Sequence, residues 1–197
     1  MAGEKPGERS RRTIIDSGAF GEIYRSWSEA IASAMSPRDA WAIIGIKRGG
    51  AILARRLKAD LEAHPPAAGA APRRRSAGDI AFGEVDISLY RDDYHLQAAQ
   101  PRVLGTEISF DLEGRRIILV DDVLYTGRTV RAAIDQILDF GRPRKIVLAV
   151  LVDRGHRELP IAPDFTGRRI ETAQEDRVEV SFRETDGEDR VELIGPR

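Results

Sequence analysis

The chain has 197 residues, enough for one α/β domain with a sizeable core but too few for two comfortable ones. Its formal net charge is -1 with 32% charged residues, so no global basic field demands nucleic acid, although a local patch is compatible with this composition. The chain contains no cysteine, which excludes disulfides, thiol catalysis and thiolate metal sites, and no apolar stretch approaches the roughly 20 residues of a membrane span.

The N-terminal residues 1–12 are polar, broken by glycine and proline, and without periodicity. They predict a disordered tail ahead of a single domain over residues 13–197. Because they contain no signal-like apolar region, we expect a cytoplasmic protein without a membrane partner. From Ser17 to Ala34 apolar residues recur at helical spacing, and this predicts an amphipathic helix that packs in the core or against another subunit.

A strand, turn and helix pattern occupies residues 41–63. The apolar run from Trp41 to Ile46 predicts a buried strand, and a helix is predicted from Ala51 to Ala63. The turn between them reads Lys47-Arg48-Gly49-Gly50. Two cations on a glycine-flexible turn at a helix N-terminus predict an anion-binding site.

The next forty residues alternate between loop and strand signals. Residues 64–78 are rich in proline, alanine and glycine and include the run Arg73–Arg75, which predicts a mobile surface insertion. Residues 79–90 alternate apolar and polar side chains and predict a half-buried strand. Residues 91–105 show no periodicity and predict a polar loop.

The stretch from Ile117 to Gly141 carries the strongest functional signal in the chain. Its first four residues are apolar and predict a strand covered on both faces of a parallel sheet. Asp121 and Asp122 follow at the carboxyl end of that strand, where ligands of open α/β sheets bind. From Val130 onward apolar residues mark one face of a helix, which Gly141 ends.

The turn between this strand and helix, Thr126–Thr129, reads TGRT. Unpaired backbone N–H groups and the positive end of the helix dipole favour an anion there. A phosphate fits the turn and the adjacent acidic pair fits sugar hydroxyls, so together they predict a ribose 5-phosphate site. Each feature alone is compatible with a solvated strand end or an ordinary helix cap, but their succession favours function. Neither a G-x-x-x-x-G-K-[ST] loop nor a G-x-G-x-x-G fingerprint after a strand occurs.

A third apolar run, Lys145 to Val152, predicts another buried strand and is followed by a charged segment. Strand-like patterns return at Val178 to Phe182 and at Val191 to Ile194. The repeated strand, turn and helix units predict the α/β class, with a central, mainly parallel sheet flanked by helices.

Three segments carry a resemblance to a known family. VDDVLYTGRT resembles the phosphoribosyl diphosphate (PRPP) motif of type I phosphoribosyltransferases. GEVDISLYRDD from Gly83 and LAVLVDRGHRELPI from Leu148 resemble the bifunctional pyrimidine operon regulator and uracil phosphoribosyltransferase family, often called PyrR. The resemblance runs from about Ile14 to the C-terminus and weakens at the N-terminal helix and near residues 63–79.

This resemblance implies a magnesium-dependent transfer of ribose 5-phosphate from PRPP to uracil, giving UMP and pyrophosphate. Asp121 and Asp122 would hold the ribose hydroxyls, directly or through water on Mg²⁺, which is itself held mainly by substrate oxygens and waters. Lys47, Arg48 and Gly49 would face pyrophosphate, although the family commonly has the order Thr-Arg-Gly where this chain has Arg48-Gly49-Gly50. The 5-phosphate would be bound by Val123, Leu124, Tyr125, Thr126, Gly127, Arg128 and Thr129.

The resemblance also implies two covers for the site. A flexible lid near residues 91–107, which contains Arg91, would close over PRPP and exclude water. The chain after the third apolar run would form a small hood over the base together with the C-terminal strands. Arg154 and Arg157 are candidates for the base pocket or for a subunit contact, with ordinary surface charge as the alternative. Family likeness implies a dimer or a tetramer.

Two other functions stay open at this point. The chain is also compatible with a UMP-sensing attenuator that binds an mRNA leader hairpin and has little enzyme activity. The first predicted helix weighs against RNA because it carries Glu22 and Glu29 beside a single Arg25, and carboxylates repel phosphates. A phosphoribosyltransferase for another base would have a similar PRPP stretch. The sequence identifies neither the catalytic base nor the base specificity.

Overall fold

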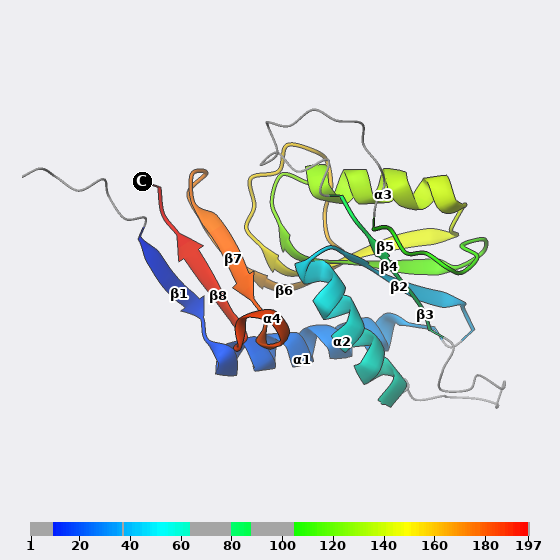
Figure 1. Ribbon diagram of the computed structural model, residues 1–197, viewed down its shortest axis with the longest axis horizontal. Helices are drawn as coiled ribbons and strands as arrows, with labels where there is room; N and C mark the ends of the chain where they lie inside the picture. Colours follow the sequence, from blue (N-terminus) through cyan, green and yellow to red (C-terminus); the bar gives the residue numbers. More distant parts are fainter. Residues whose placement is uncertain (1–9, 37, 64–79, 88–104, 197) are drawn as a thin grey trace, which may run out of the picture.

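The computed structural model describes residues 10–36, 38–63, 80–87 and 105–196. Two sheets and four helices are seen in this described part of the chain (Figure 1). In chain order the elements are β1 (Arg11–Ile15), α1 (Ser17–Ala34), β2 (Trp41–Ile46), α2 (Gly49–Ala63), β3 (Ala81–Val85), β4 (Arg116–Leu124), α3 (Arg128–Phe140), β5 (Lys145–Asp153), β6 (Phe165–Arg169), β7 (Arg177–Ser181), α4 (Arg183–Asp186) and β8 (Arg190–Ile194).

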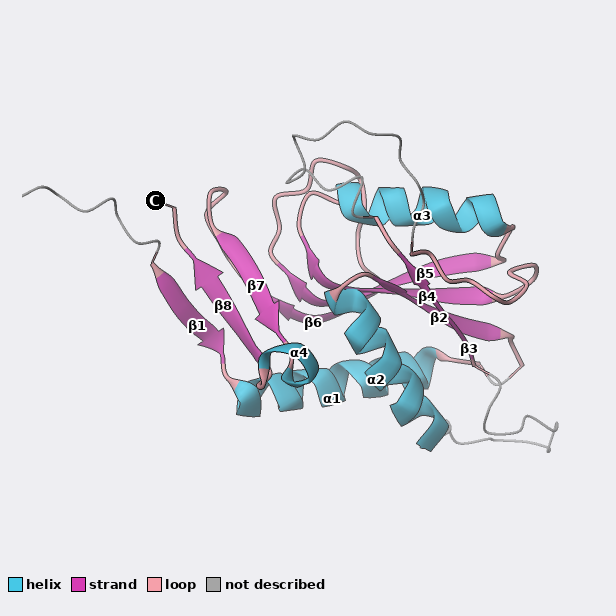
Figure 2. Cartoon of the chain, viewed as in Figure 1, coloured by secondary structure: helices cyan, strands magenta, loops and turns pink. Residues whose placement is uncertain are grey.

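The larger sheet has the strand order β3-β2-β4-β5-β6, and neighbouring strands in it pair in parallel. Helix α3 covers one face, and α1 and α2 cover the other (Figures 1 and 2). Successive residues of β4 therefore enter different cores: Ile117 belongs to the buried cluster that contains Ile137 of α3, and Ile118 belongs to the cluster that contains Leu57 of α2. Burial on both faces explains the uninterrupted apolar runs and confirms the predicted α/β class.

Helix α1 begins and ends where the sequence predicts. Asp16 caps it, since its side chain accepts a hydrogen bond from the Ala19 N–H at 2.9 Å. Helix α2 begins at Gly49, two residues earlier than predicted. Strand β4 is longer than the predicted run, because its pairing with β5 continues to Leu124 opposite Asp153. The acidic pair consequently belongs to the strand.

The smaller sheet is antiparallel, with the order β1-β8-β7, and is called the hood here. Its strands β7 and β8 come from the C-terminal chain, as predicted, whereas the segment directly after β5 is not part of this sheet and β1 is an unpredicted member. Strands β7 and β8 confirm the two C-terminal strand patterns, whereas β6 and α4 were not predicted. The prediction of a tail over residues 1–12 is wrong for Arg11 and Arg12, which begin β1. They are ordered by pairing with β8 and by ion pairs from Arg11 to Glu192 at 2.7 Å and to Glu179 at 2.9 Å.

Strand β3 lies in the first half of the predicted strand 79–90, of which residues 80–87 are described, and it pairs with β2 at the edge of the larger sheet. Its buried Glu84 faces Lys47 and Arg55, and its backbone bridges to Glu107. The predicted insertion 64–78, Arg91 and the lid as far as residue 104 lie outside the described residues. Among the described residues, no helix is long and apolar enough to cross a membrane.

Candidate functional site

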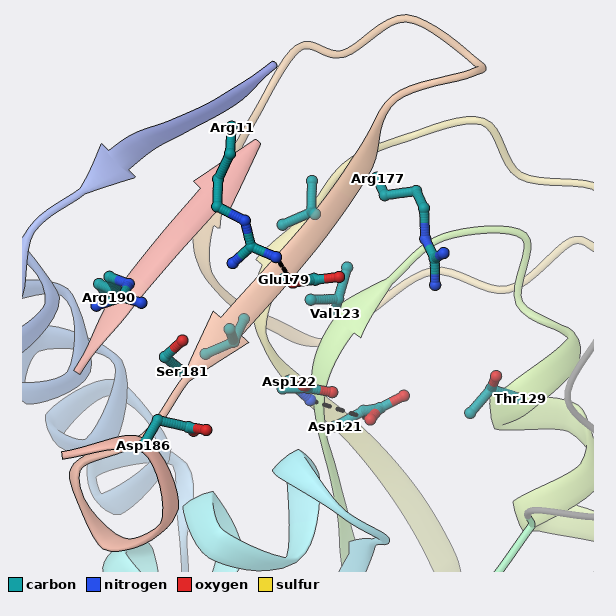
Figure 3. Close-up of a pocket in the computed structure, with 12 residues that line it drawn as sticks. Arg11, Asp121, Asp122, Val123, Thr129, Arg177, Glu179, Ser181, Asp186 and Arg190 are labelled. Carbon is teal, nitrogen blue, oxygen red and sulfur yellow. Dashed lines mark hydrogen bonds and ion pairs between the residues drawn. The ribbon is translucent and has the colours of Figure 1, made fainter. Parts of the chain in front are cut away.

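A cavity of about 550 Å³ lies between the carboxyl end of β4 and the hood (Figure 3). The core side contributes Asp121, Asp122 and Val123 from β4 and Thr129 from α3. The hood side contributes polar residues from all three of its strands and from α4. These are Arg11, Arg177, Glu179, Ser181, Asp186 and Arg190, with Val178 and Val180 between them.

The acidic pair forms the core wall of this cavity. Asp121 is 5% exposed, and its Oδ1 accepts a hydrogen bond from the Asp122 N–H at 3.0 Å. Figure 3 shows Asp121 on the side of Thr129, while Asp122 faces the hood strand that carries Glu179. Two carboxylates at this place offer several acceptor positions to the hydroxyls of a sugar.

The turn that the sequence predicts to bind the 5-phosphate, Thr126–Thr129 (the phosphate turn), comes after the end of β4. Gly127 has φ 92°, a left-handed conformation that favours glycine, and it precedes the first residue of α3. Thr126 is buried, and its carbonyl accepts the N–H groups of Glu158 at 3.0 Å and Leu159 at 3.2 Å. These bonds fasten the turn to the chain behind it. The Arg128 N–H donates to the Thr126 hydroxyl oxygen at 3.3 Å, and the N–H groups that follow in the first turn of α3 are suited to an anion.

The second turn that the sequence predicts to bind an anion, Lys47–Gly50, lies against the acidic pair. A Cβ on Gly49 would overlap the Asp122 carboxylate, and one on Gly50 would overlap the Val120 carbonyl. Glycine therefore allows the start of α2 to press on the end of β4. Arg48 is exposed. The Lys47 ammonium donates to the Gly105 carbonyl at 2.5 Å, so it is directed toward the chain that leads out of the predicted lid.

Arg154 and Arg157 lie behind the phosphate turn, and neither lines the cavity. Arg154 is 5% exposed, its guanidinium carbon stands 4.0 Å from the Tyr125 ring centroid, and burial lowers its pKa. Arg157 donates to the Tyr125 carbonyl at 2.7 Å and to Asp153 at 2.5 Å. Arg157 is thus placed to support the backbone of the turn, whereas the Arg154 side chain supports the Tyr125 ring and donates to the carbonyls of Ala173 and Gln174.

Sequence reasoning missed the residues of the hood wall. Arg177, Glu179 and Ser181 occupy alternate positions of β7, so one face of that strand is polar and faces the cavity. The alternation could have identified this face. Arg11 could not have been found, because only the pairing of β1 with β8 brings it to the site.

The residues present fit a magnesium ion held largely by its substrate. Among the described residues, no group of three or more His, Cys, Asp or Glu side chains could hold a metal ion. Asp121 and Asp122 nevertheless offer hard oxygen ligands at the cavity wall, directly or through water.

Comparison with known proteins agrees with this geometry. A family model described as "Phosphoribosyl transferase domain" matches residues 12–184. A protein of Deinococcus radiodurans named "Bifunctional protein PyrR" is 50% identical over 186 residues, which cover 94% of this chain and 96% of the relative. A Bacillus cereus protein of the same name is 48% identical over 187 residues and covers 94% and 98%.

Solved structures agree at the level of the fold. A hypoxanthine phosphoribosyltransferase from Staphylococcus aureus has a TM-score of 0.63 at 15% identity, covering 94% of this chain and 93% of its own. The Leishmania tarentolae HGPRT-ase in complex with GMP has a TM-score of 0.61 at 16% identity, with 94% and 96% covered. The family match and the high identity to the two relatives show that the chain belongs to the phosphoribosyltransferase family and, within it, to the PyrR proteins.

Proposed function

We propose that this phosphoribosyltransferase transfers ribose 5-phosphate from PRPP to uracil and that the same nucleotide site serves regulation of pyrimidine genes. One observation carries the proposal: the acidic pair lines a cavity to which the start of α3 contributes Thr129, and Gly49 at the start of α2 lies against Asp122. PRPP carries hydroxyls between two phosphate groups, which matches that order of sites. The PyrR name of the relatives supports uracil as the acceptor.

In this proposal the reaction breaks the bond from the sugar C1 to the diphosphate and joins C1 to the N1 of uracil, whose proton is released. Positive charge develops on the ring, so positioning and dryness matter more than a strong nucleophile. Asp121 and Asp122 hold the ribose hydroxyls. The turn from Val123 to Thr129 holds the 5-phosphate, Lys47, Arg48 and Gly49 face the diphosphate, and Mg²⁺ bound with PRPP supplies charge neutralisation.

The positions of Arg154 and Arg157 give them a supporting role in the same proposal. They hold Tyr125 and its neighbours from behind, so that the phosphate turn keeps its shape when the anion binds. For Arg91 of the predicted lid, we propose a role in binding PRPP from family likeness alone.

The enzyme proposal is tested by measuring PRPP-dependent UMP formation from uracil with magnesium at pH 7 to 9, with hypoxanthine, guanine and orotate as controls. We expect product from uracil and little from the others. Asp122→Asn and Thr126→Ala should each lower kcat/KM for PRPP at least about tenfold, or roughly 1.4 kcal/mol of transition-state binding, while remaining folded. No UMP from the parent chain would refute uracil as acceptor.

Regulation through RNA is the second candidate, favoured by the word "bifunctional" in the names of the relatives. Glu22, Arg25 and Glu29 are all exposed on α1, so two carboxylates accompany one guanidinium and this helix offers little attraction to phosphates. A salt titration of binding to an mRNA leader hairpin, with and without UMP, tests this function. Equally weak binding to unrelated RNA under both conditions would count against a specific attenuator.

The assembly and location of the chain complete the proposal. We infer a homodimer or homotetramer in the cytoplasm from family likeness. Light scattering at several protein concentrations tests the assembly, and a constant monomer mass would exclude it.

A further inference from the structure

The hood is joined to the core through Arg56, a residue of α2 that lies two helical turns after Gly49. Its side chain is 17% exposed. Figure 1 shows the carboxyl end of β7, α4 and the start of β8 close to α1 and α2.

Two acidic residues of the hood receive the guanidinium. The Arg56 Nε donates to Glu184 at 2.7 Å, and its two terminal nitrogens donate to the two oxygens of Asp189 at 2.6 and 3.1 Å. A two-pronged contact of this kind fixes direction as well as distance, because the planar guanidinium matches the planar carboxylate. Asp189 also accepts the Arg183 N–H at 2.9 Å, so the hydrogen bonds reach the backbone of the hood.

Two aromatic rings enclose the same guanidinium. Its carbon lies 5.8 Å from the ring centroid of Phe20 in α1 and 5.5 Å from that of Phe182 in the hood. The rings are 1% and 2% exposed and meet edge to face at 6.1 Å. Ser17 adds a hydrogen bond from its hydroxyl to the Asp189 carbonyl at 2.7 Å. Arg56 is therefore the charged centre of a contact among α1, α2 and the hood.

This contact bears on both walls of the cavity. The segment 182–189 connects β7 to β8, and Ser181, Asp186 and Arg190 beside or within it line the cavity. Helix α2, which carries Arg56, begins at Gly49, and Gly49 lies against Asp122 on the other wall. We propose that Arg56 is a positioning residue that sets the spacing between the hood and the acidic pair and thereby the affinity for the acceptor base. The kinetic part of this proposal rests on the proposed function.

The spacing is measured without any enzyme assay. Because the chain has no cysteine, Arg12→Cys and Ala59→Cys, both at exposed positions, introduce one spin label on β1 and one on α2. We expect a single narrow distance distribution in the otherwise unchanged chain. Adding Arg56→Ala should broaden or shift this distance distribution. Arg56→Lys keeps the charge but loses the paired hydrogen bonds of the guanidinium, so its distribution should lie between those of the parent chain and Arg56→Ala.

Lys58→Ala is the matched control, because Lys58 lies on the same helix and its ion pair joins it to Glu62 within α2 rather than to the hood. It should leave the distance distribution unchanged. Glu184→Gln is a milder variant that keeps the experiment interpretable if Arg56→Ala does not fold, since Glu184 is 44% exposed. We expect Glu184→Gln to broaden the distribution in the direction of Arg56→Ala.

Kinetics then connect spacing with binding. For Arg56→Ala we expect the KM for uracil to rise at least tenfold, the KM for PRPP to change less than threefold, and Arg56→Lys to recover part of the loss. If the parent chain forms no product from uracil, the proposed function is refuted. The distances between the two spin labels still test whether Arg56 sets the position of the hood. Unchanged distances in folded Arg56→Ala, or unchanged distances in Glu184→Gln when Arg56→Ala does not fold, overturn the proposal. A lower Tm with equal KM values overturns its kinetic part.

Discussion

At the scale of single residues, Gly49 is the point where the turn Lys47–Gly50, proposed to face the diphosphate, contacts the acidic pair. A methyl group at this position would overlap the Asp122 carboxylate, whose carbon would lie 2.5 Å from it. A carboxylate side chain can rotate away, so Gly49→Ala should fold but lose the native place of Asp122. We expect kcat/KM for PRPP to fall at least about tenfold, measured by initial rates.

Gly21→Ala is the control for this substitution. Gly21 lies on the exposed side of α1, and a Cβ there meets nothing within 4 Å. Alanine should stabilise the helix by about 0.5–1 kcal/mol and leave turnover unchanged. If Gly49→Ala retains the activity of the parent chain, Asp122 does not need the position seen in the structure.

At the scale of elements, the stability of the segment 182–189, which joins β7 to β8 in the hood, depends on ionised carboxylates. The Arg56 guanidinium holds the pKa of Glu184 below its usual value, and the Phe182 N–H does the same for the pKa of Asp186. A lowered folded-state pKa contributes stability above the unfolded value of about 4, and that stability is lost as the pH falls through the folded value. The free energy of unfolding should therefore fall below about pH 4.

Urea unfolding between pH 3 and pH 6 measures this dependence. Glu184→Gln should have a shallower pH dependence than the parent chain, because one of the linked protons is removed. Glu113→Gln is the control, since Glu113 is exposed and its side chain has no ion pair within the described ranges. Parallel curves for the parent chain and Glu184→Gln would contradict a contribution of Glu184.

At the scale of the whole molecule, the two apolar cores share the strands of the larger sheet. Leu57 of α2 and Ile137 of α3 are both fully buried, on different faces. Because β2, β4 and β5 contribute side chains to both cores, unfolding of one core also exposes the other core to solvent. We expect Leu57→Ala and Ile137→Ala each to cost about 2–5 kcal/mol and to lower the same single transition. Separate transitions for the two variants in urea, followed by circular dichroism, would show independent cores.

The sequence by itself determined the features that depend on near neighbours along the chain. Helix α1 follows from helical spacing, and the succession from Ile117 to Gly141 follows from an apolar run, a glycine turn and an amphipathic helix. These patterns sufficed for the α/β class, for the family and for the placement of the acidic pair at a strand end, because each is encoded within about 25 residues.

Only the tertiary structure decided which distant residues meet at the cavity. It brings Arg11 from the chain start to the hood wall and places Gly49 against Asp122. It also turns Arg154 toward the back of the phosphate turn. Strand pairing and the direction of each side chain depend on contacts between residues far apart in the sequence, and no local period carries that information.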